Sequence, residues 1–323
     1  MYIPNLASLV PSLVGAFANA FAEPGDCAGA CTNVRDPSVI QRADGKYFRF
    51  STSNKILSAS ANSLEGPWTA GGSAIEGGSK IDIPGKNILW APDVHKVGDD
   101  YYMYYSVSTL GSQTSAIGVA VSKDMSPGSW EDLGSAGITS SPTKNYNAID
   151  SSLIQANGKI YMIFGSFWGG IFQVEMHNPP TSPISDPVNL AYEPQDNHPI
   201  EGASIFQHGD WFYLFYSHGK CCKFDPQNLP PPGGEYKIKV CRSKRVDGGF
   251  VDQAGVDCTK GGGTIILQTH GNIYAPGGQS VFVDDKRGPV LYYHYLKRDV
   301  GYANEDKFLG WNVINWDGGW PSV

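Results

Sequence analysis

The sequence predicts an all-β protein, a five-bladed β-propeller, and three observations support this fold class. Glycine (39 residues), proline (22) and aromatic side chains (12%) are abundant, a composition that weakens helices and favours turns between short strands. Five segments repeat one pattern: a short apolar strand, a Gly or Asp turn, and an aromatic strand ending near Ser. Asp36, Asp93, Asp150 and Glu201 recur at intervals of roughly 50 to 60 residues, which fits four-stranded blades with variable loops.

The five units justify five blades when they are taken in order. They begin at Ser38, Val94, Ser152, Ser204 and Ser280. Their turns (ADGK, VGDD, ANGK, QHGD and DDKRG) supply residues that tolerate positive φ, as hairpins require. A β-sandwich also has regularly spaced strands, but five units in one fixed order favour the propeller. A further strand is expected in residues 116–124, 169–176, 236–244 and 300–306.

The sequence predicts an N-terminal export signal followed by one domain. Residues 1–20 are expected to be a signal peptide, because they are uncharged, largely apolar and end in the small-x-small pattern Ala18–Ala20. A membrane anchor or a buried N-terminal segment is the alternative, since a basic start is missing and Pro11 interrupts the stretch. The apolar stretch is short for a membrane span. We therefore expect a secreted, extracellular, monomeric propeller domain over residues 21–323.

Cysteine use and charge restrict the environment and the partners. All six cysteines follow residue 20, which predicts disulfides in an exported chain, with the pairing left open. Metal binding is the weaker alternative, because no Cys-x2-Cys pair with matching histidines is present. Residues 221–236 form an irregular insertion in the fourth blade, expected to be held by a disulfide. A net charge of -7 without a Lys or Arg run excludes nucleic acid and anionic membranes as expected partners.

Three acidic residues carry the functional prediction. Asp36, Asp150 and Glu201 each stand just before the apolar strand of their unit, and in a propeller they would meet at one mouth of the central channel. Inverting glycoside hydrolysis needs a base and an acid roughly 6.5–9.5 Å apart, with water between them. We expect Asp36 to be the base, Glu201 the acid, and Asp150 to raise the pKa of Glu201. Taken singly, each could be a turn residue, and Asp93 is expected to be structural.

Aromatic and polar neighbours of these acids suggest a sugar platform. Trp90, Asn147, Ser166, Phe167 and Trp168 lie close to the acids in sequence. Aromatic faces stack on sugar C–H surfaces, while amides and hydroxyls bind ring hydroxyls. Phe167 and Trp168 could equally be core residues.

Ordered motifs extend over almost the whole chain and resemble glycoside hydrolase family 43, in particular its fungal endo-1,5-α-L-arabinanases. From about residue 23 to residue 323 they include RDPSVI, LWAPDV, STLGSQTSAIG, NAIDSSLI, FGSFWGGI, EGASIF, YKIKVCRS and LYYHY. The resemblance implies a five-bladed propeller that hydrolyses arabinan with inversion and without an organic cofactor. It implies the same roles for Asp36, Asp150 and Glu201. The substrate contacts that it implies are Gly111, Asn147, Ala148, Ile149, Ser166, Phe167 and Trp168.

His294 has two interpretations. From the sequence alone, a histidine inside the strand LYYHYL is more simply a satisfied core residue. The resemblance instead implies that His294 holds a central ion, often calcium, through bound waters.

One residue departs from the family pattern and keeps alternatives open. Arabinanases usually carry His before the first catalytic Asp, where this chain has Arg35. This places a fixed positive charge beside Asp36 and reshapes the neighbouring subsite. An exo-acting arabinofuranosidase or xylosidase, or a glycan-binding propeller without catalysis, is therefore the alternative. A fructan-active enzyme would need carboxyls only about 5–5.5 Å apart, because it forms a covalent intermediate.

Overall fold

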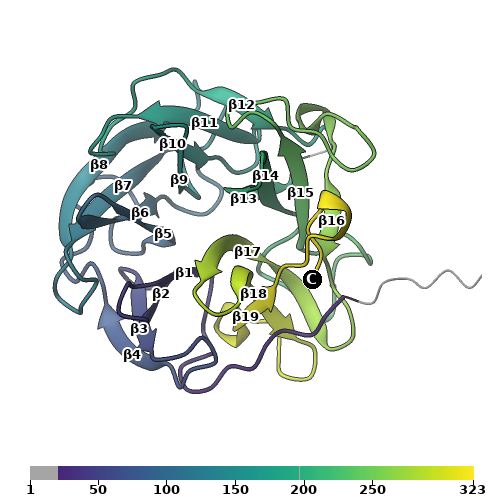
Figure 1. Cartoon of the computed structure of the whole chain (residues 1–323), viewed down its shortest axis with the longest axis horizontal. Helices are drawn as coiled ribbons and strands as arrows, with labels where there is room; N and C mark the ends of the chain where they lie inside the picture. The colour runs from purple at the N-terminus through teal and green to yellow at the C-terminus, as the bar shows by residue number, and fades with distance from the viewer. Residues whose placement is uncertain (1–20, 196) are drawn as a thin grey trace, which may run out of the picture.

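Five small antiparallel sheets form a ring around a central axis in the computed structural model, which describes residues 21–195 and 197–323 (Figure 1). The expected signal peptide, residues 1–20, lies outside the described residues. The ring confirms the predicted five-bladed propeller. The blades are, in chain order, β1 (Ser38–Gln41), β2 (Tyr47–Ser51), β3 (Leu57–Ala61) and β4 (Thr69–Ser73); β5 (Trp90–Val97), β6 (Asp100–Val107), β7 (Ser115–Ser122) and β8 (Glu131–Ser140); β9 (Ser152–Ala156), β10 (Lys159–Phe164), β11 (Ile171–Met176) and β12 (Val188–Ala191); β13 (Ile200–His208), β14 (Trp211–His218), β15 (Lys237–Ser243) and β16 (Thr264–Leu267); β17 (Ile273–Asp284), β18 (Gly288–Lys297) and β19 (Phe308–Val313).

The aromatic second strands hold neighbouring blades together. Successive side chains of a strand point to opposite faces of its sheet. Tyr104 of β6 therefore packs towards the third blade, with Phe164. Its neighbour Tyr105 packs towards the first blade, with Phe50. Equivalent clusters lie between blades three and four, four and five, and five and one, so burial of large aromatic surfaces closes the whole ring.

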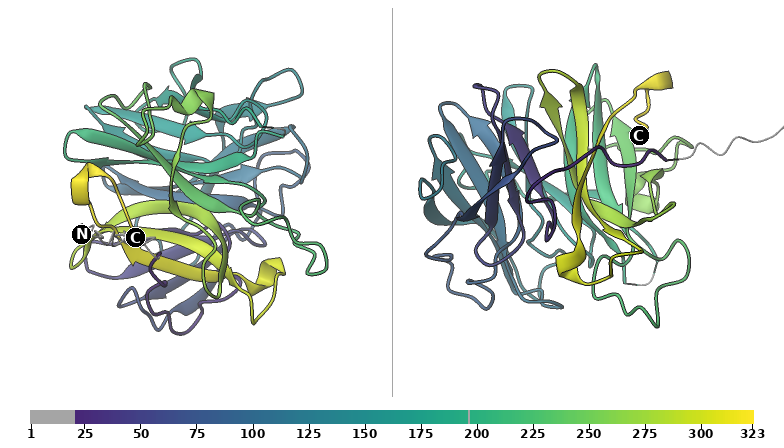
Figure 2. Two further views of the ribbon diagram at one scale, coloured as in Figure 1. Left: turned by 90° about the vertical axis from the view of Figure 1, so that its right-hand side faces the viewer. Right: turned by 90° about the horizontal axis from the view of Figure 1, so that it is seen from below.

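The fifth blade is completed by the start of the chain. It contains only three strands, β17, β18 and β19. The segment from residue 25 to residue 34 runs antiparallel along β19, because Gly25 N–H donates to Trp311 O and Leu309 N–H donates to Cys31 O. Figure 2 shows this purple segment crossing the yellow strands. The two ends of the described chain thus meet at one blade.

One expected strand is absent from its predicted place. Residues 300–306 were expected to continue the fifth blade, but they form a loop that ends in the 3-10 turn η2 (Asn304–Asp306). The third strand is β19 instead. Pairing with β18 selects residues 308–313, since their side chains can alternate between the two faces of the blade. The other two 3-10 turns are η1 (Cys258–Lys260) and η3 (Asp317–Gly319).

All six cysteines form disulfides, Cys27–Cys31, Cys221–Cys222 and Cys241–Cys258. The second lies at the start of the insertion at residues 221–236, between β14 and β15 of the fourth blade, but it does not bridge this loop as expected. It joins adjacent residues rather than the two ends of the loop. Within residues 21–195 and 197–323, no helix is long and apolar enough to cross a membrane.

Candidate active site

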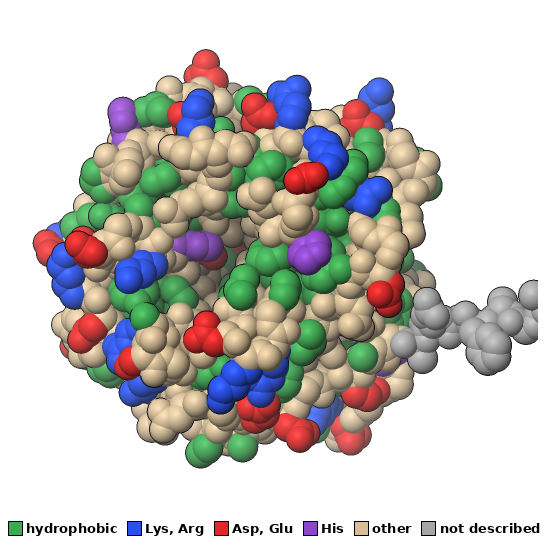
Figure 3. Space-filling model, viewed as in Figure 1, with side chains coloured by type: hydrophobic (Ala, Val, Ile, Leu, Met, Phe, Trp, Pro, Cys, Tyr) green, Lys and Arg blue, Asp and Glu red, His purple; other side chains and the backbone are tan. Residues whose placement is uncertain are grey.

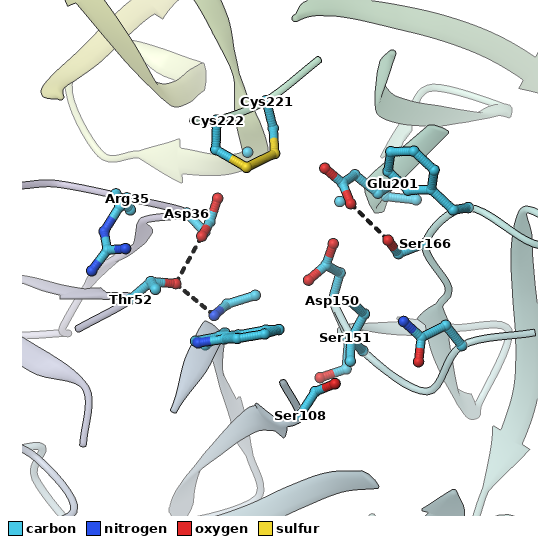
Figure 4. Close-up of a pocket in the computed structure, with 18 of the residues that line it drawn as sticks. Arg35, Asp36, Thr52, Ser108, Asp150, Ser151, Ser166, Glu201, Cys221 and Cys222 are labelled. Carbon is cyan, nitrogen blue, oxygen red and sulfur yellow. Dashed lines mark hydrogen bonds between the residues drawn. A yellow bond between two sulfur atoms is a disulfide. The ribbon is translucent and has the colours of Figure 1, made fainter. Parts of the chain in front are cut away.

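The first strand of each blade lies nearest the axis, and the three acids sit at the start of three of these strands. Asp36 and Asp150 stand two residues before β1 and β9, as expected. Glu201 differs, because it lies inside β13, paired with Ser217, before a break in register. All three line one cavity of about 910 Å³, and Figure 4 draws their carboxyl groups pointing into it. The predicted convergence of the acids is therefore present.

Asp36 is held by contacts on both sides of its carboxyl group. Its backbone is left-handed, with φ 42°, a strained conformation that persists where the surroundings fix it. Its N–H donates to His294 Nδ1 over 3.0 Å, and Thr52 Oγ1 donates to its Oδ2 over 2.8 Å. A Cβ on Gly278 would lie 2.7 Å from Oδ1, so glycine there makes room for this carboxyl. Asp36 is thus oriented towards the cavity.

Glu201 is half-buried, and its carboxyl accepts two hydrogen bonds. Ser166 Oγ donates to Oε2 over 2.6 Å, and the Tyr236 hydroxyl donates to Oε1 over 3.0 Å. Burial raises the pKa of Glu201, the two hydroxyls oppose this rise, and the charge of Asp36 adds to it. A raised pKa keeps the carboxyl protonated closer to neutral pH, as a proton donor requires.

Asp150 has the more strongly raised pKa of the two neighbouring acids. Burial is the main cause, and the charges of Glu201 and Asp36 add to it. Asp150 was expected to raise the pKa of Glu201; the charge that raises this pKa is that of Asp36, and Glu201 in turn raises the pKa of Asp150. Two adjacent carboxyls titrate as a pair. The Asp150–Glu201 pair therefore holds at least one proton more tightly than isolated carboxyls would.

Most of the residues expected to contact substrate lie in the cavity wall. Ala148 does not, because its side chain is fully buried in the cluster between blades two and three. The Asn147 side chain also has a structural partner, since Ser115 Oγ donates to its Oδ1 over 2.7 Å. The expected residues that line the cavity are Trp90, Gly111, Asn147, Ile149, Ser166, Phe167 and Trp168.

His294 does not fit a metal site. Burial lowers its pKa well below the usual value, so the ring is neutral. Its Nδ1 accepts the Asp36 N–H, so this nitrogen is not free to bind an ion or a metal-bound water. Lys307 Nζ also lies 3.0 Å from Nε2. Residues 21–195 and 197–323 contain no cluster of three His, Cys, Asp or Glu that could hold a metal, so the expected calcium ion is not supported.

Arg35 and Asp93 also line the cavity, but among the described residues neither side chain pairs with Asp36, Asp150 or Glu201. Figure 4 draws the Arg35 guanidinium pointing away from the Asp36 carboxyl, and no ion pair of the described residues joins the two. Asp93 is structural, as expected: its Oδ2 accepts the Leu153 N–H and lies 2.8 Å from His95 Nε2.

Several residues of the site escaped the sequence analysis. Thr52, which contacts Asp36, follows the aromatic strand of its unit, the same place that the predicted substrate contact Ser166 takes in the third unit. That recurrence was a usable signal. Tyr236 and Lys307 offered none, because one looks like an aromatic strand residue and the other like a surface lysine. Cys221 and Cys222 also line the cavity.

The surface around the ring carries both signs of charge. Figure 3 shows one face, hollowed at the centre, with acidic and basic side chains interspersed around the rim. No extended basic patch is visible on this face.

These features define a carbohydrate-cleaving propeller, and comparison with known proteins places it in a family. The family model "Glycosyl hydrolases family 43" matches residues 31–321. The chain belongs to this family.

Two kinds of relative are informative. A curated protein of Emericella nidulans, "Probable arabinan endo-1,5-alpha-L-arabinosidase A", is 54% identical over the full length of both chains. Among solved structures, an exo-1,5-α-L-arabinanase from a bovine ruminal metagenomic library has a TM-score of 0.80 and 31% identity, covering 92% of this chain and 99% of its own. A Bacillus licheniformis endo-arabinanase has a TM-score of 0.79, 29% identity and the same coverage.

Proposed function

We propose that this protein hydrolyses internal α-1,5-L-arabinofuranosidic bonds of linear arabinan with inversion of configuration. The observation that carries the proposal is the presence of Asp36, Asp150 and Glu201 in one large cavity with aromatic walls. The similarity to a full-length arabinan endo-1,5-α-L-arabinosidase supports arabinan as the substrate. The volume of about 910 Å³ is at the upper end of ordinary ligand pockets, which suits several sugar rings.

The proposed roles follow from the contacts of each acid. The Asp36 carboxylate, oriented by Thr52, takes a proton from a water molecule. The water oxygen then bonds to the anomeric carbon as the bond from that carbon to the leaving oxygen breaks. Glu201, whose pKa is raised, gives its proton to the leaving oxygen. Afterwards Asp36 loses its proton to solvent and Glu201 takes one up from solvent. Asp150 helps to keep Glu201 protonated.

Product analysis on linear arabinan tests this proposal. We expect a spread of short oligosaccharides early in the reaction, and NMR should show the inverted anomer as the first product. Glu201→Gln and Asp36→Asn should each lower kcat by at least about a hundred-fold. Glu175→Gln is a matched control, because Glu175 pairs with Lys159 at the surface.

Other outcomes separate the remaining alternatives. Release of one short product from chain ends would identify an exo-acting enzyme, as in the ruminal relative. Binding without release of sugar would identify a glycan-binding propeller. Full activity of Glu201→Gln would reject the assigned acid.

We also propose that the protein is secreted and acts as a monomer. Its three disulfides suit an oxidising compartment. N-terminal sequencing of protein from culture medium should begin near residue 21, and size-exclusion chromatography with light scattering should give the mass of one chain. Retention of residues 1–20 or a dimer mass would contradict these expectations.

A further inference from the structure

The disulfide between Cys221 and Cys222 forms part of the cavity wall. Both residues are half-buried and line the same cavity as the three acids. Figure 4 draws the sulfur–sulfur bond between the side chains of Asp36 and Glu201, on the side of the pocket opposite Asp150. The other two disulfides do not line this cavity. One disulfide is thus placed where the substrate would lie.

The loop that presents this disulfide is anchored at several points. The Lys220 N–H donates to Gly234 O, and the Tyr236 N–H donates to Lys220 O, which closes the base of the loop. Phe224 is buried against Tyr274, with ring centroids 5.2 Å apart. These contacts fix the loop against the fourth and fifth blades.

The disulfide is also tied to the interior of the channel. Lys307 Nζ donates to the Cys221 carbonyl over 3.1 Å and lies 3.0 Å from His294 Nε2. His294 in turn accepts the Asp36 N–H. The position of the disulfide is therefore coupled through two side chains to the position of the proposed base.

The chemistry of a disulfide suits a sugar ring. It is apolar and polarizable and has no hydrogen to donate. The C–H faces of furanose rings bind to such surfaces, as they do to aromatic rings. The aromatic side chains of this cavity wall include Trp90, Phe167 and Trp168, with Tyr236 and Tyr292. The disulfide adds an apolar surface next to the acids.

We propose that the Cys221–Cys222 disulfide is a substrate-binding surface that contacts an arabinofuranose ring beside the proposed acid and base. The inference rests on the proposed arabinan hydrolysis and adds a residue pair that fixes the ring at the cleavage point. Adjacent cysteines supply this surface without the bulk of an indole.

Two double variants and one control test the inference. C221S/C222S should raise KM for linear arabino-oligosaccharides about ten-fold, the change that loss of roughly 1.4 kcal/mol of binding gives. The pH profile should not move, because the acids remain. C221V/C222V, which is also apolar, should recover most of this loss. C241S/C258S removes a disulfide buried between blades three and four; it should lower Tm and leave KM unchanged.

The outcomes distinguish this inference from the proposed function. If the wild-type protein releases no sugar from arabinan, the proposed function fails first. If it does, an unchanged KM in both double variants overturns the disulfide surface alone. Equal losses in the Ser and Val variants would also overturn it, because they would show that the disulfide only orders the loop. Binding of arabino-oligosaccharides to the Glu201→Gln background, measured by calorimetry, should follow the same order as KM.

Discussion

At the scale of single residues, Ser166 controls how tightly Glu201 holds its proton. Its hydroxyl donates to Oε2 and opposes the rise in the pKa of Glu201. Ser166→Ala should therefore raise this pKa. An acid must be protonated to act, so activity is lost as pH rises through its pKa, and the alkaline limb of the pH–rate profile should move up by about 0.5 to 1 pH unit.

The profile of kcat against pH measures this shift. Tyr236→Phe removes the second donor to Glu201 and should move the limb in the same direction. Ser185→Ala, at an exposed turn, is the control. A limb that moves to lower pH in either active-site variant would mean that another group is the acid.

The raised pKa of Asp150 predicts how the stability of the protein depends on pH. Its pKa is raised in the folded protein by burial and by Glu201, whereas the unfolded value is near that of a free Asp. The folded state therefore binds the proton more tightly, and stability falls as pH rises above roughly 4. Asp150→Asn removes this loss. It should raise Tm by about 2 to 4 °C at pH 7 and by almost nothing at pH 4, while lowering kcat.

Calorimetry at the two pH values checks this expectation. Asp44 gives a comparison in which the pKa shift has the opposite sign, because its hydrogen bond with Arg42 lowers the pKa of Asp44 to about 2. Asp44→Asn should lower Tm slightly at pH 7, not raise it. Equal changes at pH 4 and pH 7 for Asp150→Asn would show that charge is not the cause.

At the scale of elements, a ring of hydrogen bonds joins each blade to the next. Near the end of the second strand of four blades, a side chain accepts an N–H from the inner strand of the next blade or from the residues just before that strand. Between blades three and four, Ser166 contacts the Glu201 side chain instead. The four N–H bonds run from Ala91 to Thr52, from Asp150 to Ser106, from Gly278 to Ser217 and from Asp36 to His294.

Ser106 tests this ring. Ser106→Ala leaves the Asp150 N–H without its acceptor, and an unsatisfied buried donor costs about 1 to 3 kcal/mol. Urea unfolding should show a loss of this size together with a lower kcat. Ser58→Ala, which removes an exposed bond to Gly72, should change stability by less than about 0.5 kcal/mol. If both variants behave alike, the bond to Asp150 has no special role.

The elements also show what could be read from the sequence. The repeat identified all five inner and second strands, because turn chemistry and aromatic alternation are local signals. It misplaced Glu201 relative to β13, since a break in register depends on pairing with β14. His294 completes the ring of bonds from a strand position that looked like core, and Lys307 reaches it from a different strand. Such contacts join residues far apart in the chain, and no local pattern encodes them.

At the scale of the whole molecule, closure of the ring depends on Trp311. Its Nε1–H donates to Asp26 O, and its ring lies so close to Gly25 that a Cβ there would be 2.3 Å from it. Trp311→Ala should lower the free energy of unfolding by about 3 to 5 kcal/mol. Limited proteolysis should then cut within residues 21–34 first.

A second tryptophan provides the comparison. Trp168 is 36% exposed in the cavity wall. Trp168→Ala should change KM and leave Tm nearly unchanged. A large fall in Tm for Trp168→Ala, or none for Trp311→Ala, would contradict this division between binding and closure.

The pairing of the first described residues with β19 also sets the order in which the protein can be completed. Residues 25–34 leave the ribosome well before their partner strand, β19, has been made. Until then the fifth blade cannot form, so Asp36 lacks the His294 that holds its backbone. The growing chain is an open arc with uncovered strand edges, which are prone to wrong pairing. Catalytic competence therefore arrives only after β18 and β19 have been made.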